Sequence, residues 1–271
     1  MQGEFHDGTK FYCEHTSHHP PITNFLIEDV DGLYTMSGYY EITGKMEMNA
    51  LISGLRGPNE LRFKDGHHIR FGYPSYRLGG TISGARSVEL IGSCTFEDLT
   101  NNRRAVVLMN TYKAGYFGGY QGRKDEVEGV IYETSQIKSD PKTIKTTYGK
   151  DIKFVTDIKN PADCKREICK IKGSWLRDLQ FDDRVYWSIQ KDKPVRFMHQ
   201  QGDHILPSDC RFREDLIWLK YNYMQIAHQW KIRLEVQQRL DRKNRNDAKA
   251  GKAIKRTYSQ PSSSPIRPKQ P

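Results

Sequence analysis

Hydrophobic and polar positions alternate in short runs along most of the chain, and this pattern predicts a fold built mainly of β-strands. Apolar runs bounded by turn residues recur from the N-terminus to about residue 135. Residues 61–63 and 68–71 flank an Asp-Gly pair at residues 65–66, which is a strong signal of a β-hairpin. Further strand signals lie at residues 25–27, 87–91, 105–108, 167–171 and 182–189, and within 33–53. Many short strands at this spacing favour a strongly curved antiparallel sheet or barrel.

The pattern changes near residue 216, where apolar residues begin to recur at steps of three and four. They are Leu216, Leu219, Tyr223, Ile226 or Ala227, Trp230 and Leu234. This spacing predicts one long helix with a single apolar face, running to about Asn244 without an internal proline or glycine. Residues 246–271 are rich in Lys, Arg, Ser and Pro, a composition typical of disorder. Such a tail either keeps the protein in solution or contacts an anionic membrane.

Composition supports a β-rich globular protein and narrows its partners. The chain of 271 residues has 15 Tyr, 11 Phe, 4 Trp and 22 Gly, and its formal net charge is +10. A basic protein favours an anionic partner, which could be a membrane, a phospholipid headgroup or a nucleic acid. The five cysteines are odd in number and lack CxxC spacing, so we expect a reducing compartment. We see no signal peptide and no long apolar run, so we expect a cytoplasmic protein that contacts membranes only peripherally.

An uncommon stretch, Glu-His-Thr-Ser-His-His-Pro-Pro at residues 14–21, follows a short strand-like run at residues 11–13. The two prolines can neither continue a helix nor donate to a sheet ladder, so His18 and His19 are expected at a rigid corner where a strand ends. Two imidazoles at such a corner can bind an anion, ligate a metal, carry out acid–base chemistry, or simply be loop histidines. With His15 they supply two or three of the ligands that zinc needs, but no cysteine pair or HExxH motif accompanies them. A serine-hydrolase GxSxG motif is also absent from the sequence.

Three charged residues, Lys231, Glu235 and Arg239, stand four apart within the predicted helix and so form one stripe on its surface. On the residues alone, such a stripe is ordinarily a solvated helix face with weak ion pairs. Spacing by itself therefore gives these residues no function.

Three segments together resemble the oxysterol-binding-protein-related family. Residues 14–21 are similar to its Glu-Gln-Val-Ser-His-His-Pro-Pro signature and depart from it at His15 and Thr16. Residues 205–215 resemble its Leu-Pro-x-Ser/Thr-Asp-x-Arg-x-Arg-x-Asp segment. Residues 231–239 look like its Lys-x-x-Leu-Glu-x-x-Gln-Arg segment.

The resemblance covers the chain to about residue 245 and implies the C-terminal two thirds of a lipid-transfer domain. Such a domain is α+β but mainly β, with an incomplete antiparallel β-barrel around a hydrophobic tunnel and a long C-terminal helix. We therefore expect a lipid-binding domain over residues 1–245 and a disordered basic tail over 246–271. From the resemblance we expect the family's upstream helices, its lid over the tunnel and its Lys-Pro-x-Asn-Pro-like motif to lack a counterpart in this sequence, which begins 13 residues before Glu14.

In that family, the histidine pair and the helix residues share one phosphoinositide headgroup site. The resemblance thus implies that His18, His19, Lys231, Glu235 and Arg239 bind the headgroup. Lysine and arginine suit phosphate as a point charge and a planar fork. Glu235 cannot donate to phosphate, so we expect it to orient the two cations or to accept from an inositol hydroxyl.

The resemblance implies a monomer that exchanges a sterol or another lipid for phosphatidylinositol 4-phosphate between membranes. No enzymatic activity, metal or cofactor is expected. The alternative is a phosphoinositide-dependent sensor or scaffold that carries no cargo. A histidine-dependent hydrolase or metalloenzyme is a third class, and a nucleic-acid binder would rest on charge alone and is not expected.

Overall fold

The computed structural model describes residues 1–110, 113–114, 120–121, 123–137, 163–194, 197–198, 205–206 and 209–252. The chain divides into two compact units, Met1–Cys210 and Arg211–Pro271. All the described strands lie in the first unit, and both described α-helices lie in the second. Most of the predicted tail, from residue 253 on, lies outside the described residues.

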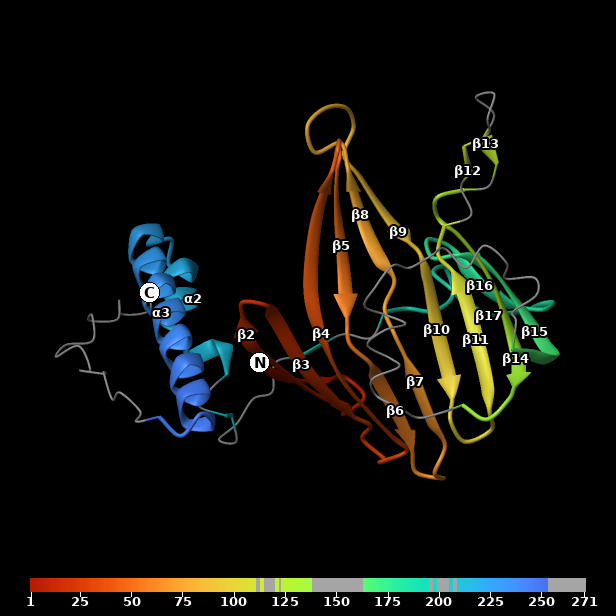
Figure 1. Cartoon of the computed structure of the whole chain (residues 1–271), viewed down its shortest axis with the longest axis horizontal. Coiled ribbons are helices and arrows are strands. Elements are labelled where there is room, and N and C mark those ends of the chain that lie inside the picture. The colour runs from red at the N-terminus through yellow and green to blue at the C-terminus, as the bar shows by residue number, and fades with distance from the viewer. Residues whose placement is uncertain are drawn as a thin grey trace. The chain divides into compact units, whose positions relative to one another are not determined.

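The first unit is dominated by one 16-stranded sheet (Figure 1). The strands in chain order are β1 (Gln2–Phe5), β2 (Lys10–His18), β3 (Pro21–Glu28), β4 (Tyr34–Glu47), β5 (Ala50–Arg56), β6 (Asn59–Phe63), β7 (His68–Phe71), β8 (Ser75–Gly79), β9 (Ser87–Ile91), β10 (Ser93–Asp98), β11 (Arg103–Leu108), β12 (Lys113–Ala114), β13 (Tyr120–Gln121), β14 (Glu126–Thr134), β15 (Cys164–Ser174), β16 (Asp178–Phe181), β17 (Arg184–Ser188) and β18 (Phe197–Met198). The sheet runs in the order β17-β16-β15-β14-β11-β10-β7-β6-β4-β3-β2-β1-β18, and β5, β8 and β9 branch from β4. Its printed pairs are antiparallel, and the described strands do not close on themselves, which confirms the predicted mainly β fold with an open sheet.

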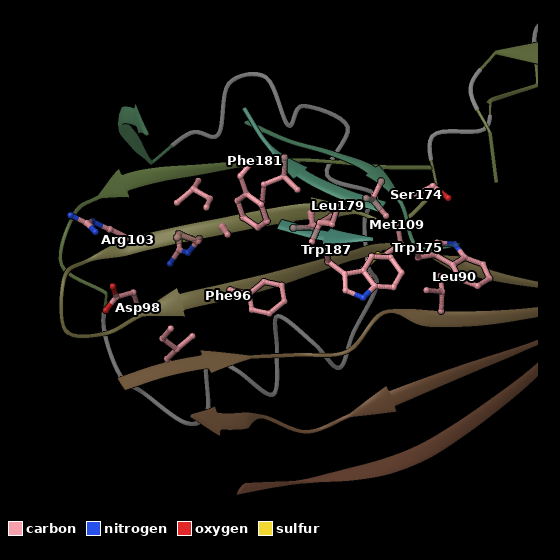
Figure 2. A pocket seen from close by; sticks show the side chains of 17 residues that line it. Leu90, Phe96, Asp98, Arg103, Met109, Ser174, Trp175, Leu179, Phe181 and Trp187 are labelled. Carbon is pink, nitrogen blue, oxygen red and sulfur yellow. The ribbon is translucent and has the colours of Figure 1, made fainter. Parts of the chain in front are cut away.

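Both faces of the sheet carry apolar residues, because neighbouring positions along a strand point to opposite sides. One buried cluster comprises Val106, Val130 and Tyr132, and the other comprises Val107, Val127 and Ile171. We call the face that carries the second cluster the inner face. Strands β15 to β17 fold over this face, so that Leu179 and Trp187 point toward Phe96 of β10 (Figure 2).

The turn residues in the sequence predict the β6–β7 hairpin correctly but do not predict the turn between β4 and β5. The hairpin predicted around residues 65–66 is formed by β6 and β7, with Gly66 at a φ of +92°. The segment 33–53 is instead divided between β4 and β5 by a turn in which Met48 has a φ of +39°. Methionine gives no signal for a left-handed position, which is commonest for glycine and asparagine.

The described part of the second unit contains two α-helices where one was predicted. α2 (Glu214–Lys220) ends before a turn in which Asn222 has a φ of +64°, and α3 (Met224–Lys249) follows. Prediction of a single helix from residue 216 was therefore wrong, because a left-handed asparagine interrupts the helix without disturbing the apolar spacing. α3 also includes residues 246–249, which the composition of the sequence places in the disordered tail. None of the described helices is long and apolar enough to cross a membrane.

Candidate functional site

The histidine pair lies at the tight turn between β2 and β3. β2 ends at His18 and β3 begins at Pro21, with a cis peptide bond between His19 and Pro20. This arrangement confirms the predicted corner where a strand ends. The rings of His18 and His19 are 4.4 Å apart between centroids.

A β-bulge brings a third histidine to the same place. His15 pairs with Thr23, whereas Ser17 pairs with Ile22, so Thr16 is an extra residue in β2. In a regular strand, residues three apart point to opposite faces; the bulge reverses this relation for His15 and His18. Their ring centroids are accordingly 6.0 Å apart.

Side-chain contacts hold this bulge in position. His15 Nδ1 lies 3.1 Å from the hydroxyl of the buried Thr23, and the Asn24 amide donates to the Thr16 hydroxyl over 2.7 Å. We call His15, His18 and His19 the histidine cluster. Among the residues that the structure describes, no three or more His, Cys, Asp or Glu side chains are arranged to hold a metal. The sequence suggests His15 only as a metal ligand and does not predict it as a headgroup residue.

The inner face of β4, β5, β8 and β9 is apolar but remains open. Met46, Leu51, Leu78 and Val88 stand opposite one another across these four strands. Met46 is 60% exposed and Val88 is 61% exposed. The adjacent residues of the same four strands point to the other face of the sheet, and most of them are charged. They are Lys45, Ile52, Arg77 and Glu89. The apolar row therefore presents a hydrophobic surface on the inner side of the sheet.

An apolar pocket of about 610 Å³ continues this inner face under the folded strands (Figure 2). Its lining residues are Ile69, Leu90, Phe96, Asp98, Arg103, Arg104, Ala105, Val107, Met109, Val127, Ile131, Ile171, Ser174, Trp175, Leu179, Phe181 and Trp187. Leu90 belongs to β9, next to the open apolar row, whereas Asp98 and Arg103 lie at the opposite end of the pocket. An apolar pocket with charged groups at one end suits a ligand that is largely hydrophobic and carries a polar group.

A polar network lies at the same end of the sheet, on the face opposite the inner face. Arg104 pairs with Glu97 over 3.0 Å and also with Asp163, and the Asp163 carboxylate accepts from Tyr132 over 2.9 Å and from Thr134 over 2.8 Å. Burial opposes ionisation of Asp163, but the donated hydrogen bonds and Arg104 outweigh it and lower its pKa. Burial raises the pKa of Tyr132 to about 12, so its hydroxyl stays a donor. The network thus keeps an ionised carboxylate beside the buried strand β14.

The charged stripe of the second unit has the predicted geometry. Glu235 lies 3.8 Å from Lys231 through one oxygen and 3.8 Å from Arg239 through the other. The side chains of Lys231 and Arg239 are 60% and 62% exposed, so these loose pairs leave both cations accessible. That Lys231, Glu235 and Arg239 form one site with His18 and His19 stays a prediction.

The matched segment at residues 205–215 contacts the N-terminal strand β1. The carboxylate of Asp209, which is 3% exposed, accepts from the backbone N–H of Gln2 over 2.7 Å. Gln2 in turn accepts from the backbone N–H of Leu206 over 3.1 Å. Asp209 thereby ties the end of the first unit to β1, next to the strand that carries the histidine cluster.

Sequence comparisons point to one family. A family model described as oxysterol-binding protein matches residues 3–267. Oxysterol-binding protein 9 of Dictyostelium discoideum is 28% identical over 244 residues, which cover 89% of this chain and 53% of that protein. Oxysterol-binding protein-related protein 3C of Arabidopsis thaliana is 25% identical over 250 residues, covering 89% and 50%. The chain thus spans about half the length of these relatives.

Solved structures show the same fold. The Osh3 ORD from Saccharomyces cerevisiae, in complex with PI(4)P, matches with a TM-score of 0.57 and 18% identity over 91% of this chain and 60% of that one. The Osh1 ORD domain in complex with cholesterol matches with a TM-score of 0.59 and 15% identity over 94% and 60%. At these identities the likeness is one of fold.

Proposed function

The chain belongs to the oxysterol-binding protein family, and from this premise we propose that it binds a sterol or another membrane lipid on its inner face. The observation that carries the proposal is the 610 Å³ apolar pocket that continues an open apolar surface. A hydrophobic face that leaves Met46 and Val88 about three-fifths exposed is stabilised when an apolar ligand covers it. The cholesterol-bound relative supports a sterol as one such ligand.

The second part of the proposal is a phosphoinositide headgroup site made of His18, His19, Lys231, Glu235 and Arg239. The imidazoles donate N–H groups to phosphate, the lysine supplies a point charge and the arginine a bidentate fork. Glu235 lies between the two cations and keeps their side chains on one side of α3. The PI(4)P-bound relative supports this ligand class.

Exchange of the two lipids between membranes follows from these two sites. Phosphatidylinositol 4-phosphate binds on one membrane and the apolar cargo on the other, with no covalent step, in a cytoplasmic monomer that contacts membranes peripherally. The proposed lipid-binding domain, residues 1–245, extends with α3 to Lys249. A sensor or scaffold that binds the headgroup without transport is the second candidate, favoured because the inner face is open rather than enclosed.

Titration with liposomes that contain phosphatidylinositol 4-phosphate tests the headgroup site. We expect His18→Ala/His19→Ala and Lys231→Ala each to weaken binding by about tenfold or more, since each removes charge-assisted bonds. The matched controls are His67→Ala and Lys243→Ala, both at exposed positions of the same units. Equal binding by the variants and the wild type would refute the site.

Transfer of a fluorescent sterol between two liposome populations separates the two candidate functions. Exchange that depends on phosphatidylinositol 4-phosphate supports the transfer protein. Headgroup binding without measurable transfer of sterol or phosphatidylserine supports the sensor. Metal content and hydrolysis of the bound lipid, measured on the same protein, test the enzyme class.

A further inference from the structure

The turn between β4 and β5 and the loop between β8 and β9 meet at one end of the sheet (Figure 1). Asn49 joins them: its amide nitrogen donates to the Ser83 carbonyl over 2.6 Å, and its oxygen accepts from the N–H groups of Ile82 and Ser83 over 2.7 and 3.0 Å. We call residues 46–49 and 80–86 the loop tip. These bonds make the tip one preorganised surface rather than two independent loops.

The loop tip presents apolar side chains to solvent. Met48 is 96% exposed, the largest fraction among the large hydrophobic residues that the structure describes. Ile82 is 76% exposed and Met46 is 60% exposed. Neighbouring apolar side chains on a fixed projecting tip are typical of an interaction surface.

The position of the tip relates it to the lipid sites. Ile22, which follows the histidine turn, pairs with Glu41 of β4, and β4 runs on to Glu47 at the same end of the sheet. Glu47 lies six residues along β4 beyond the partner of Ile22, a distance of about 20 Å at about 3.4 Å a residue. Met46 also begins the apolar row that crosses the inner face to Val88.

Charge near the tip favours an anionic partner. Lys45 pairs there with Glu47, and both Arg77 and Lys124 pair with Glu89. With Arg86, these six groups carry two more positive than negative charges. Cations around an inserted apolar tip are attracted to anionic lipid headgroups. A lipid bilayer is the partner that matches both the apolar tip and the apolar row behind it.

We infer that the loop tip docks the protein on anionic bilayers by inserting Met48 and Ile82 among the lipids. Docking places the apolar row at the membrane, where a lipid can pass to the inner face. The choice of a bilayer as partner rests on the proposed function.

Binding to vesicles of phosphatidylcholine with about 20 mol% phosphatidylserine and no phosphoinositide tests the inference, since anionic lipid attracts the basic rim of the tip. Met48→Asn/Ile82→Ser is the informative variant, because asparagine tolerates the left-handed backbone at residue 48. The control is Val30→Ser/Leu33→Ser, which removes two side chains that are 56% and 55% exposed at the opposite end of β4. We expect about a tenfold loss of vesicle binding for the tip variant and less than about twofold for the control.

Salt separates insertion from charge attraction. The ratio between wild type and tip variant should persist from about 0.15 M to about 0.5 M salt, because apolar insertion is not screened. Asn49→Ala, which unties the two loops but keeps Met48 and Ile82, should lose a smaller part of the binding. Equal loss in tip variant and control, or a tip variant that binds like wild type, would overturn the inference.

Two further readouts keep this test separate from the proposed function. If the tip variant abolishes self-association in sedimentation velocity without changing vesicle binding, the tip contacts a second copy and the inference fails. The headgroup titration uses phosphatidylinositol 4-phosphate, which the docking vesicles lack. The protein can therefore lack selectivity for phosphatidylinositol 4-phosphate and still bind the docking vesicles through the tip. It can also show that selectivity while the tip variant binds the docking vesicles like the wild type.

Discussion

The pocket half and the open half of the sheet carry similar apolar residues on the same inner face, yet their burial differs. In the pocket half, Val127 is 4% exposed and Ile171 is 5% exposed, because β15 to β17 fold over the face. In the open half, Met46 and Val88 remain 60% and 61% exposed. The same alternation of residues therefore builds a stabilising core in one region and a surface ready for a ligand in the other.

The largest expected effect is a difference in stability between substitutions in the pocket half and in the open half. Ile171→Ala should lower the free energy of unfolding by about 3 kcal/mol, because it leaves a cavity in the buried cluster. Val88→Ala in the open half should cost less than about 0.5 kcal/mol. Urea unfolding of both variants measures the difference, and equal losses would show that the open half is buried in the folded protein.

A second substitution asks which half holds the apolar ligand. Ala105 lines the pocket, and Ala105→Phe should fill part of it and weaken sterol binding by about tenfold. Headgroup binding should be unchanged. Ser53→Phe, on the inner face of the open half, is the companion variant. Loss of sterol binding in Ser53→Phe alone would move the ligand to the open half.

The polar network on the opposite face of the pocket half should make the stability of the protein depend on pH. The pKa of Asp163 is lower in the folded chain than in the unfolded one, so its stabilisation is complete above the unfolded pKa of about 3.9 and is lost as pH falls through the folded value. Asp163→Asn should cost about 1 kcal/mol near pH 7, since the carboxylate is partly exposed, and should flatten the acid limb of stability. Urea unfolding at several pH values measures this.

Glu133→Gln is the control for that experiment. Glu133 pairs with Arg166 at an exposed position of the same strand pair, and exposed pairs contribute little to stability. An acid limb that is equally flat in both variants would contradict a special role for Asp163.

The smallest expected effect concerns His15, the third imidazole at the turn between β2 and β3. His15→Ala should weaken binding to liposomes that contain phosphatidylinositol 4-phosphate by about threefold, because one hydrogen-bonding ring of the histidine cluster is lost. Liposome titration of the variant beside the wild type measures the change, and unchanged binding would exclude His15 from the site.

Local chemistry made much of the fold predictable. The Asp-Gly turn marked the β6–β7 hairpin, the paired prolines marked the end of β2, and apolar spacing marked the C-terminal helical region. Each of these signals depends only on residues close together in the sequence. It can therefore be recognised without knowing which strand or helix packs beside it. The turn at Met48 lacked such a signal, because methionine rarely adopts a left-handed conformation. Asn222 is a residue that can end a helix, but the apolar spacing continues across it and conceals the break.

Some residues of the candidate site could be predicted from the sequence, and others could be found only in the structure. Motif resemblance identified His18 and His19 and the charged stripe of α3, whose ion-pair spacing follows from helix geometry alone. His15 could not be added from sequence, since residues three apart in a regular strand face opposite sides. Only the register of β2 against β3, with Thr16 as the extra residue, brings the His15 and His18 rings together.

The sequence by itself determined the strand and helix content, the histidine corner and the charged stripe, because short-range periodicity and turn chemistry encode them. Tertiary structure decided the bulge, the fold of β15 to β17 over the inner face, and the joining of two loops through Asn49. These features depend on pairings between residues far apart in the chain. The alternation of apolar and polar positions states which face is hydrophobic, but only those pairings decide whether that face is covered.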